Sequence, residues 1–140
     1  MMKVFKNDQH WVVVIAKGEE LISSLKDLCQ KESIYSAWVQ GLGGSLEATL
    51  GLYNLETKEY EQHQLADGPY EVAGLQGNVS VFNGEVALHL HASLAGADLQ
   101  AKAGHIHKLV IGGTMELMLT PLQNPLERRY SKDIGLSLID

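Results

Sequence analysis

Residues 88–107 read LHLHASLAGADLQAKAGHIH and hold four of the six histidines of this chain, as two His-x-His pairs. The first pair belongs to a run in which apolar and polar side chains alternate with a period of two. Successive side chains of a strand point to opposite faces, so Leu88 and Leu90 face a core while His89 and His91 share the other face, roughly 7 Å apart. The alternation therefore predicts a strand whose two imidazoles can share one metal ion.

The second pair, His105 and His107, follows Gly104 and a short turn-like stretch. A strand that returns beside the first would bring a third imidazole opposite His89 and His91, which predicts a three-histidine metal site. His105 and His107 fall on the same face of such a strand, so the residues alone do not choose between them. The alternative is that these histidines are solvated on the wet face or bonded to neighbouring carbonyls.

The three expected imidazole ligands limit which metal ions can bind. Three imidazoles without thiolates suit zinc first, while nickel, copper or iron can also bind them. Nitrogen donors argue against magnesium and calcium, which prefer oxygen. The cofactor that we expect is therefore zinc or another divalent transition metal.

The rest of the chain is predicted to be mostly strands around one amphipathic helix. Apolar residues recur at spacings of three and four over residues 19–31, with Glu19 and Glu20 where the helix dipole favours acids. Strands are expected at residues 11–15, 34–40, 46–53, 58–64, 70–82, 109–119 and 134–139. Asn83-Gly84 is typical of a type I′ hairpin turn into the histidine strand. This order predicts the α+β class, a mostly antiparallel β-sheet packed with one main helix.

Glycine clusters interrupt two of the expected strands. The run Gly41–Gly44 is expected to end one strand in a tight connection, because it lacks the GxGxxG spacing and the Walker lysine of phosphate-binding loops. Gly74 and Gly77 fall inside the 70–82 strand and suggest a bulge or a close approach of another backbone.

The length and net charge of the chain exclude several classes of function. The 140 residues correspond to a single domain, and the only cysteine, Cys29, falls in the helical pattern as a packed thiol. No apolar run is long enough to cross a bilayer and the first residues lack the apolar core of a signal peptide, so we expect no membrane partner and a cytoplasmic location. A net charge of −6 would on average repel a phosphate backbone.

Acidic residues near the histidines decide between a binding site and an enzyme. Three histidines leave one zinc coordination position for water or a ligand, as in catalytic sites. A catalyst would also need a proton carrier, for which Glu47, Asp98 and Glu116 are the candidates. Each also fits a surface charge, a turn residue or a partner of a metal ligand.

Several motifs occur together in one order: a helix, AWVQGLGGSLEATLGLYN, GPYEVAGLQGNVS, HLHASLAGAD and AGHI. In this the chain resembles the PPC (plants and prokaryotes conserved) domain, which in plant proteins accompanies AT-hooks. The resemblance covers about residues 10–120 and leaves 121–140 as a C-terminal tail. It implies an α+β fold, a homotrimer and metal ligation by His89, His91 and His105, with His107 as an extra.

The AT-hook, a basic arginine-glycine-arginine-proline core, does not occur in this sequence. DNA binding by the plant proteins is therefore a poor guide to the function of this chain. The hypothesis that we prefer is a zinc-binding homotrimer with a ligand-binding or regulatory role, in which the metal can accept a small-molecule ligand. A zinc-dependent enzyme acting on a small molecule is one alternative. A DNA-binding regulatory protein is the other.

Overall fold

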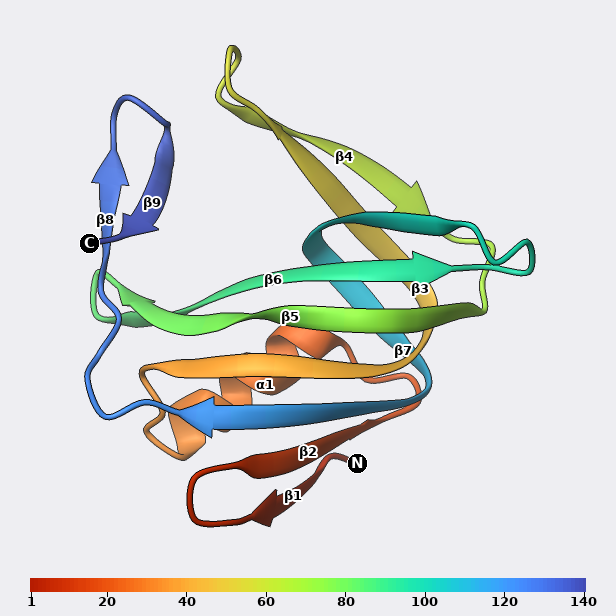
Figure 1. The fold of residues 1–140 in the computed structure, drawn as a ribbon, viewed down its shortest axis with the longest axis horizontal. Helices are drawn as coiled ribbons and strands as arrows, with labels where there is room; N and C mark the ends of the chain where they lie inside the picture. The colour runs from red at the N-terminus through yellow and green to blue at the C-terminus, as the bar shows by residue number, and fades with distance from the viewer.

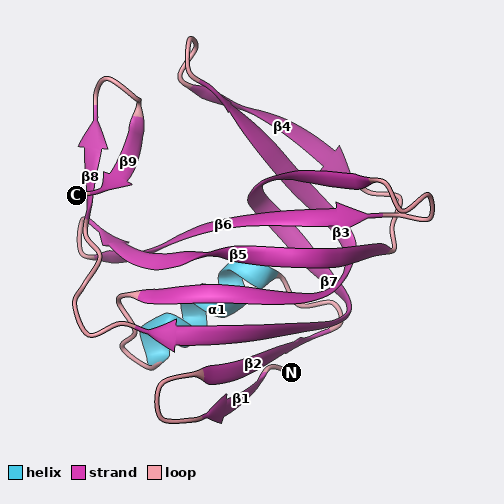
Figure 2. Cartoon of the chain, viewed as in Figure 1, coloured by secondary structure: helices cyan, strands magenta, loops and turns pink.

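The computed structural model describes residues 1–140 as a curled antiparallel sheet with one helix against it (Figures 1 and 2). The elements are β1 Lys3–Lys6, β2 Trp11–Ala16, α1 Leu21–Lys31, β3 Ala37–Asn54, β4 Glu59–Leu65, β5 Tyr70–Phe82, β6 Glu85–Ala95, β7 Ala101–Pro121, β8 Arg128–Ser131 and β9 Leu136–Ile139. Seven strands pair in the order β1-β2-β7-β6-β5-β3-β4, and β7 also pairs with β3. The pairings of β7, β6, β5 and β3 therefore close into a ring.

The observed class is mostly β. Every ladder between named strands is antiparallel, as predicted, but only the 11 residues of α1 are helical. The α+β label consequently fits only loosely. Helix α1 has neither the length nor the apolar character needed to cross a bilayer.

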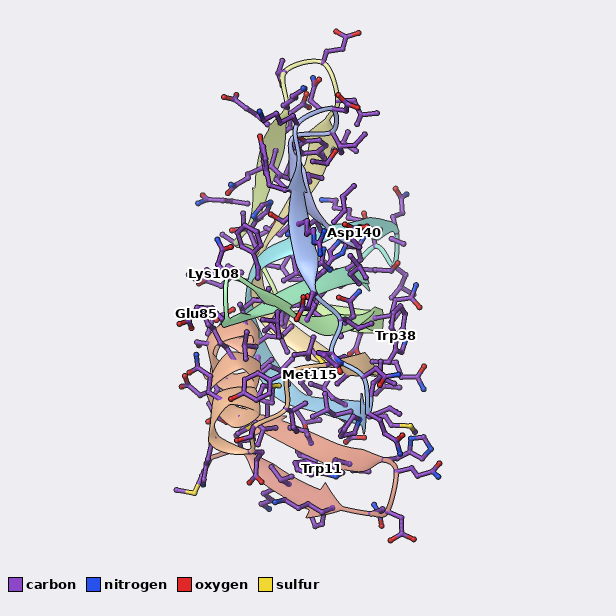
Figure 3. The ribbon with its side chains drawn as sticks, turned by 90° about the vertical axis from the view of Figure 1, so that its left-hand side faces the viewer. Trp11, Trp38, Glu85, Lys108, Met115 and Asp140 are labelled. Carbon is purple, nitrogen blue, oxygen red and sulfur yellow. The ribbon has the colours of Figure 1, made fainter.

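Helix α1 begins two residues later than the sequence pattern suggested, because Glu20 caps it. The Glu20 carboxylate accepts hydrogen bonds from the backbone N–H groups of Ile22 and Ser23, which the first turn leaves without partners. One stripe of the helix is buried and joins the core that lies between α1 and the sheet. Figure 3 shows α1 on one side of the sheet and Trp38 on the other. Cys29 lies in the buried stripe, and burial raises the pKa of its thiol to about 11, as expected of a packed thiol.

The glycine run does not end a strand, so the prediction of two strands at 34–40 and 46–53 was wrong. Both belong to the 18-residue strand β3, which begins at Ala37 and runs through Gly41–Gly44. A side chain at Gly41 or Gly43 would collide with the backbone of β7, at Glu116 and Thr114 respectively. Glycine therefore serves the close crossing of two bent strands, with register shifts on either side, rather than a turn.

The glycines of β5 behave as predicted. The register between β5 and β6 shifts between Val72 and Gly74, which is a bulge. A side chain at Gly77 would collide with the carbonyl of His89, which is the close backbone approach. The turn that follows has φ values of 51° at Asn83 and 78° at Gly84, as a type I′ turn requires.

Both ends of the chain hold strands that the sequence pattern did not indicate. Strand β1 pairs with β2 at the edge of the large sheet. Strand β8 pairs with β9, which occupies 136–139 of the expected 134–139 strand, in a separate two-stranded sheet. The tail is joined to β5 by the hydrogen bond from Val81 N–H to the Leu126 carbonyl, so β8 and β9 stand beside the outer end of β5 (Figure 1).

Candidate metal centre

Two neighbouring strands position three imidazoles. His89 and His91 lie on β6, where they alternate with the buried residues Leu90 and Ala92. His105 lies on β7 directly opposite His91 in the antiparallel register. The return strand expected from the sequence therefore brings the third imidazole to the first two.

The three side chains are close enough to converge on one ion. Their ligand nitrogens all lie within 4.8 Å of one another, and the Nε2 atoms of His89 and His91 are 3.1 Å apart. Two imidazole nitrogens on a tetrahedral zinc stand about 3.3 Å apart, given bonds of about 2.05 Å. The set contains nitrogen alone, so its chemistry fits zinc or a similar transition metal and leaves the fourth position open.

His107 lies outside this group of three. Its ring packs edge-on against Tyr60 with centroids 4.8 Å apart, and its Nε2 is buried without a hydrogen-bond partner. A side chain at Gly51 would collide with that nitrogen. The glycine of β3 thus makes room for His107, whose ring lies 4.7 Å from that of His105.

Burial and mutual repulsion favour the neutral forms of His105 and His89. Desolvation, with the nearby His107, His89 and His91, lowers the pKa of His105 to about 4. Desolvation first, and then the charges of His91 and Arg128, also lower the pKa of His89. Neutral imidazole is the form that ligates a metal, so the site favours the binding-competent state around pH 7.

A groove of about 900 Å³ opens beside the histidines, where β3 and β4 diverge from the start of β7. It is lined by Leu50, Gly51, Leu52, Tyr53, Tyr60, His63, Gln64, Leu65, His89, His91, Lys102, Ala103, Gly104, His105 and Leu136. The Tyr60 hydroxyl is 3.4 Å from Nδ1 of His105, and the two rings lie 4.6 Å apart. Tyr60 was not predicted from the sequence, because no local pattern links it to a histidine 45 positions away.

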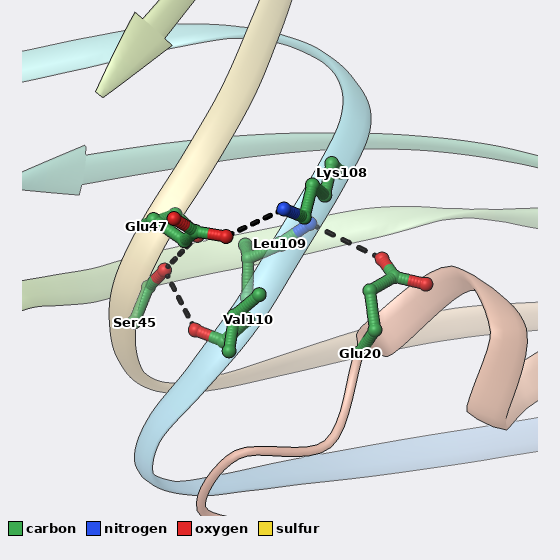
Figure 4. A network of polar contacts seen from close by, with 6 residues as sticks. All are labelled: Glu20, Ser45, Glu47, Lys108, Leu109 and Val110. Atoms are coloured by element: carbon green, nitrogen blue, oxygen red, sulfur yellow. Dashed lines mark hydrogen bonds and ion pairs between the residues drawn. The ribbon is translucent and has the colours of Figure 1, made fainter. Parts of the chain in front are cut away.

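The three acidic candidates lie away from the groove. Glu47 forms an ion pair with Lys108 at 2.5 Å, beside the contact between Glu20 and the backbone of Leu109 (Figure 4). Asp98 is a turn residue whose Oδ1 accepts a hydrogen bond from the Gln100 N–H at 3.0 Å. Glu116 is exposed on the part of β7 that pairs with β2. No carboxylate lines the groove.

A family model and several solved structures match this chain. The model of the Plants and Prokaryotes Conserved (PCC) domain matches residues 2–123. A search of curated proteins found no match.

Three of the solved structures are similar over nearly their whole length. A protein of Bacteroides thetaiotaomicron described as a "putative DNA binding protein" is 30% identical, with a TM-score of 0.95 over 100% of this chain and 97% of that one. A plant- and prokaryote-conserved protein of Pyrococcus horikoshii is 29% identical, with a TM-score of 0.87 over 100% and 94%. A "metal-containing protein" of Archaeoglobus fulgidus is 25% identical, with a TM-score of 0.85 over 99% and 96%.

Proposed function

The chain belongs to the Plants and Prokaryotes Conserved domain family, and from the histidine cluster we propose that it is a zinc-binding protein with a ligand-binding or regulatory role. His89, His91 and His105 would hold the ion. The observation that carries the proposal is the approach of their three ligand nitrogens to within 4.8 Å, from two strands whose register fixes them. The Archaeoglobus fulgidus relative, described as metal-containing, supports it.

A bound ion would polarise whatever occupies its open position, and the chain supplies the surroundings. The lowered pKa values keep the imidazoles of His89 and His105 neutral. Tyr60 stacks on His105 and restricts the orientation of that ring. The groove gives a small molecule access to the histidines.

We propose that 1–140 form one domain that assembles as a homotrimer. Trp38 and Leu42 of β3 and Met118 of β7 are exposed together on the side of the sheet that α1 does not cover. Several exposed apolar side chains on one face, here beside polar residues such as Gln40, are typical of protein interfaces. Light scattering should give about 46 kDa, three times the 15.3 kDa chain, and a monomer at micromolar concentration would contradict the proposal.

A zinc-dependent enzyme is the second candidate. The observation in its favour is that Tyr60 and His63, both able to carry a proton, line the same groove as the histidines. Against it, the groove holds no carboxylate to act as a general base. Zinc-dependent hydrolysis of an activated ester would favour the enzyme over the binding protein, provided that this activity is lost in Tyr60→Phe.

DNA binding is the third candidate, favoured by the description of the Bacteroides thetaiotaomicron relative. The net charge of −6 opposes it, and a trimer would carry three times that, or −18. We expect binding to AT-rich duplex DNA no tighter than about 10 μM near physiological salt. An anisotropy titration that gives sub-micromolar, salt-sensitive binding would favour the DNA-binding function instead.

Metal content tests the main proposal directly. Purified protein reloaded with zinc should carry about one ion per chain, and the double variant His89→Ala/His91→Ala should carry almost none. The double variant His10→Ala/His63→Ala removes as many imidazoles from outside the cluster and should keep the ion. Equal zinc content in both double variants, measured by elemental analysis, would contradict the site.

A further inference from the structure

Arg128, the first residue of β8, is a half-buried cation without an acidic partner. Its Nε donates to Ser80 Oγ at 2.6 Å, its Nη1 to the Ser137 carbonyl at 2.8 Å and its Nη2 to Asn78 Oδ1 at 2.9 Å. All three acceptors are neutral, and Arg128 takes part in none of the four ion pairs of the structure. The tail is therefore held over β5 by a guanidinium whose charge remains uncompensated.

The position of this charge is beside the histidine cluster. Asn78, which holds Nη2, is the direct register partner of His89 across β5 and β6. The Ser137 carbonyl, which accepts from Nη1 of Arg128, follows directly after Leu136 of the groove lining. Arg128 thus lies next to residues that line the groove.

The guanidinium still has hydrogen-bonding capacity. Arginine carries five N–H donors, and the three contacts leave two of them free. A partly buried charge without a counter-ion is unfavourable, and a carboxylate or similar anion would supply both the charge and two acceptor oxygens. The chemistry that fits this position is a planar or tetrahedral anionic oxygen group.

The groove itself suits the rest of such a ligand. Its walls include the apolar or aromatic side chains of Leu52, Tyr53, Tyr60, Leu65 and Leu136, with the cation Lys102 and no carboxylate among them. The lining therefore offers a cationic ligand no carboxylate with which to form an ion pair. Leu136 comes from β9, so the tail supplies part of the wall as well as the charge.

We infer that the groove binds a small organic anion, with Arg128 recognising the anionic head and the side chains of Leu52, Tyr53 and Leu136 contacting the apolar body. The inference rests on the proposed function, because the head would also reach the open position of the metal held by the three histidines. Arg128 and Leu136 lie beyond residues 2–123, which match the family model. The tail therefore determines which ligand this site selects.

Octanoate is a suitable probe, and octylammonium and acetate are its controls for charge and for apolar length. Isothermal titration calorimetry on the zinc-loaded protein should show octanoate binding at least about tenfold more tightly than either control. Arg128→Gln should weaken octanoate binding at least about tenfold, because hydrogen bonds to a charged group are lost. Arg129→Gln is the matched control: Arg129 is exposed and pairs only with Asp140, so octanoate affinity should not change.

A second variant protects the test against a folding defect in Arg128→Gln. Leu52 is 66% exposed, so Leu52→Glu should fold normally while placing a negative charge in the groove. It should also weaken octanoate binding at least about tenfold. Unchanged octanoate affinity in Leu52→Glu, or in a folded Arg128→Gln, would overturn the inference, as would equal binding of octylammonium.

Zinc content, measured on the same samples, separates this inference from the proposed function. Full zinc content with no preference for octanoate would overturn the anion site alone. Absence of zinc from the wild type would contradict the proposed function. Titration of the metal-free protein would then decide the anion site, because Arg128-dependent octanoate binding supports it and its absence overturns it.

Discussion

The two halves of β7 show how one strand can serve both stability and function. Over residues 109–119 the inward side chains Leu109, Ile111, Met115, Leu117 and Leu119 are all fully or almost fully buried. Much of this half pairs with β3 on one side and with β2 on the other. Over residues 101–107 only Ile106 is buried. Here β7 pairs with β6 from Ala101 to His105 and with β3 only at His105 and Ile106, beyond which β3 continues with β4 alone.

The difference has a physical consequence. Where strands pair on both sides and a helix covers one face, no polar group can remain without a hydrogen bond. Where β3 diverges from β7, the groove lets imidazoles be partly desolvated and still reachable. The site therefore lies where the packing opens, on a strand that the other half anchors.

Leu109→Ala should produce the largest change in stability. Loss of this fully buried side chain should lower the free energy of unfolding by about 2–5 kcal/mol, through lost burial and the cavity left behind. Met118→Ala, on the exposed face of the same strand, should cost much less. Urea unfolding of both variants measures the contrast, and similar losses would mean that the anchoring half is not where stability resides.

Acid should weaken the folded state through the histidine half. The pKa of His105 is about 4 in the folded protein and near 6.5 in the unfolded chain, so between these values the unfolded chain binds more protons. Stability of the metal-free protein should accordingly fall as the pH drops from about 6.5 to 4, and this contribution is fully present above 6.5.

His105→Gln should reduce that slope, because it removes the group with the shifted pKa. His10→Gln changes an exposed imidazole outside the cluster and should leave the slope as it is. Urea unfolding at several pH values in the presence of a chelator measures both. If the free energy of unfolding depends on pH to the same extent in both variants, desolvation of the cluster is not the source of the pH dependence.

The smallest effect concerns His107. Its buried Nε2 lacks a hydrogen-bond partner, and an unsatisfied buried polar atom costs about 1–3 kcal/mol. His107→Leu should therefore be neutral or should stabilise the fold by about 1 kcal/mol, with zinc content unchanged. Loss of zinc in this variant would place His107 among the ligands and extend the site toward Gly51.

The sequence determined much of the scaffold around the site because the signals are local. Alternation of apolar residues around His89 and His91 places both imidazoles on one face of a strand. Asn83-Gly84 has the two positive φ values that turn the chain into that strand. Spacings of three and four identify α1. Each of these depends on neighbours within a few residues, whose geometry the strand or helix period fixes.

Other features were decided only by the tertiary structure, because they depend on contacts between distant residues. The glycines at 41–44 look like a turn until β7 is placed against them, since only the crossing strand explains the missing side chains. The register of β7 sets His105 opposite His91 and turns His107 toward Tyr60 and Gly51. Arg128 reaches the neighbourhood of His89 because the tail folds back over β5, and no sequence period relates residues 39 positions apart.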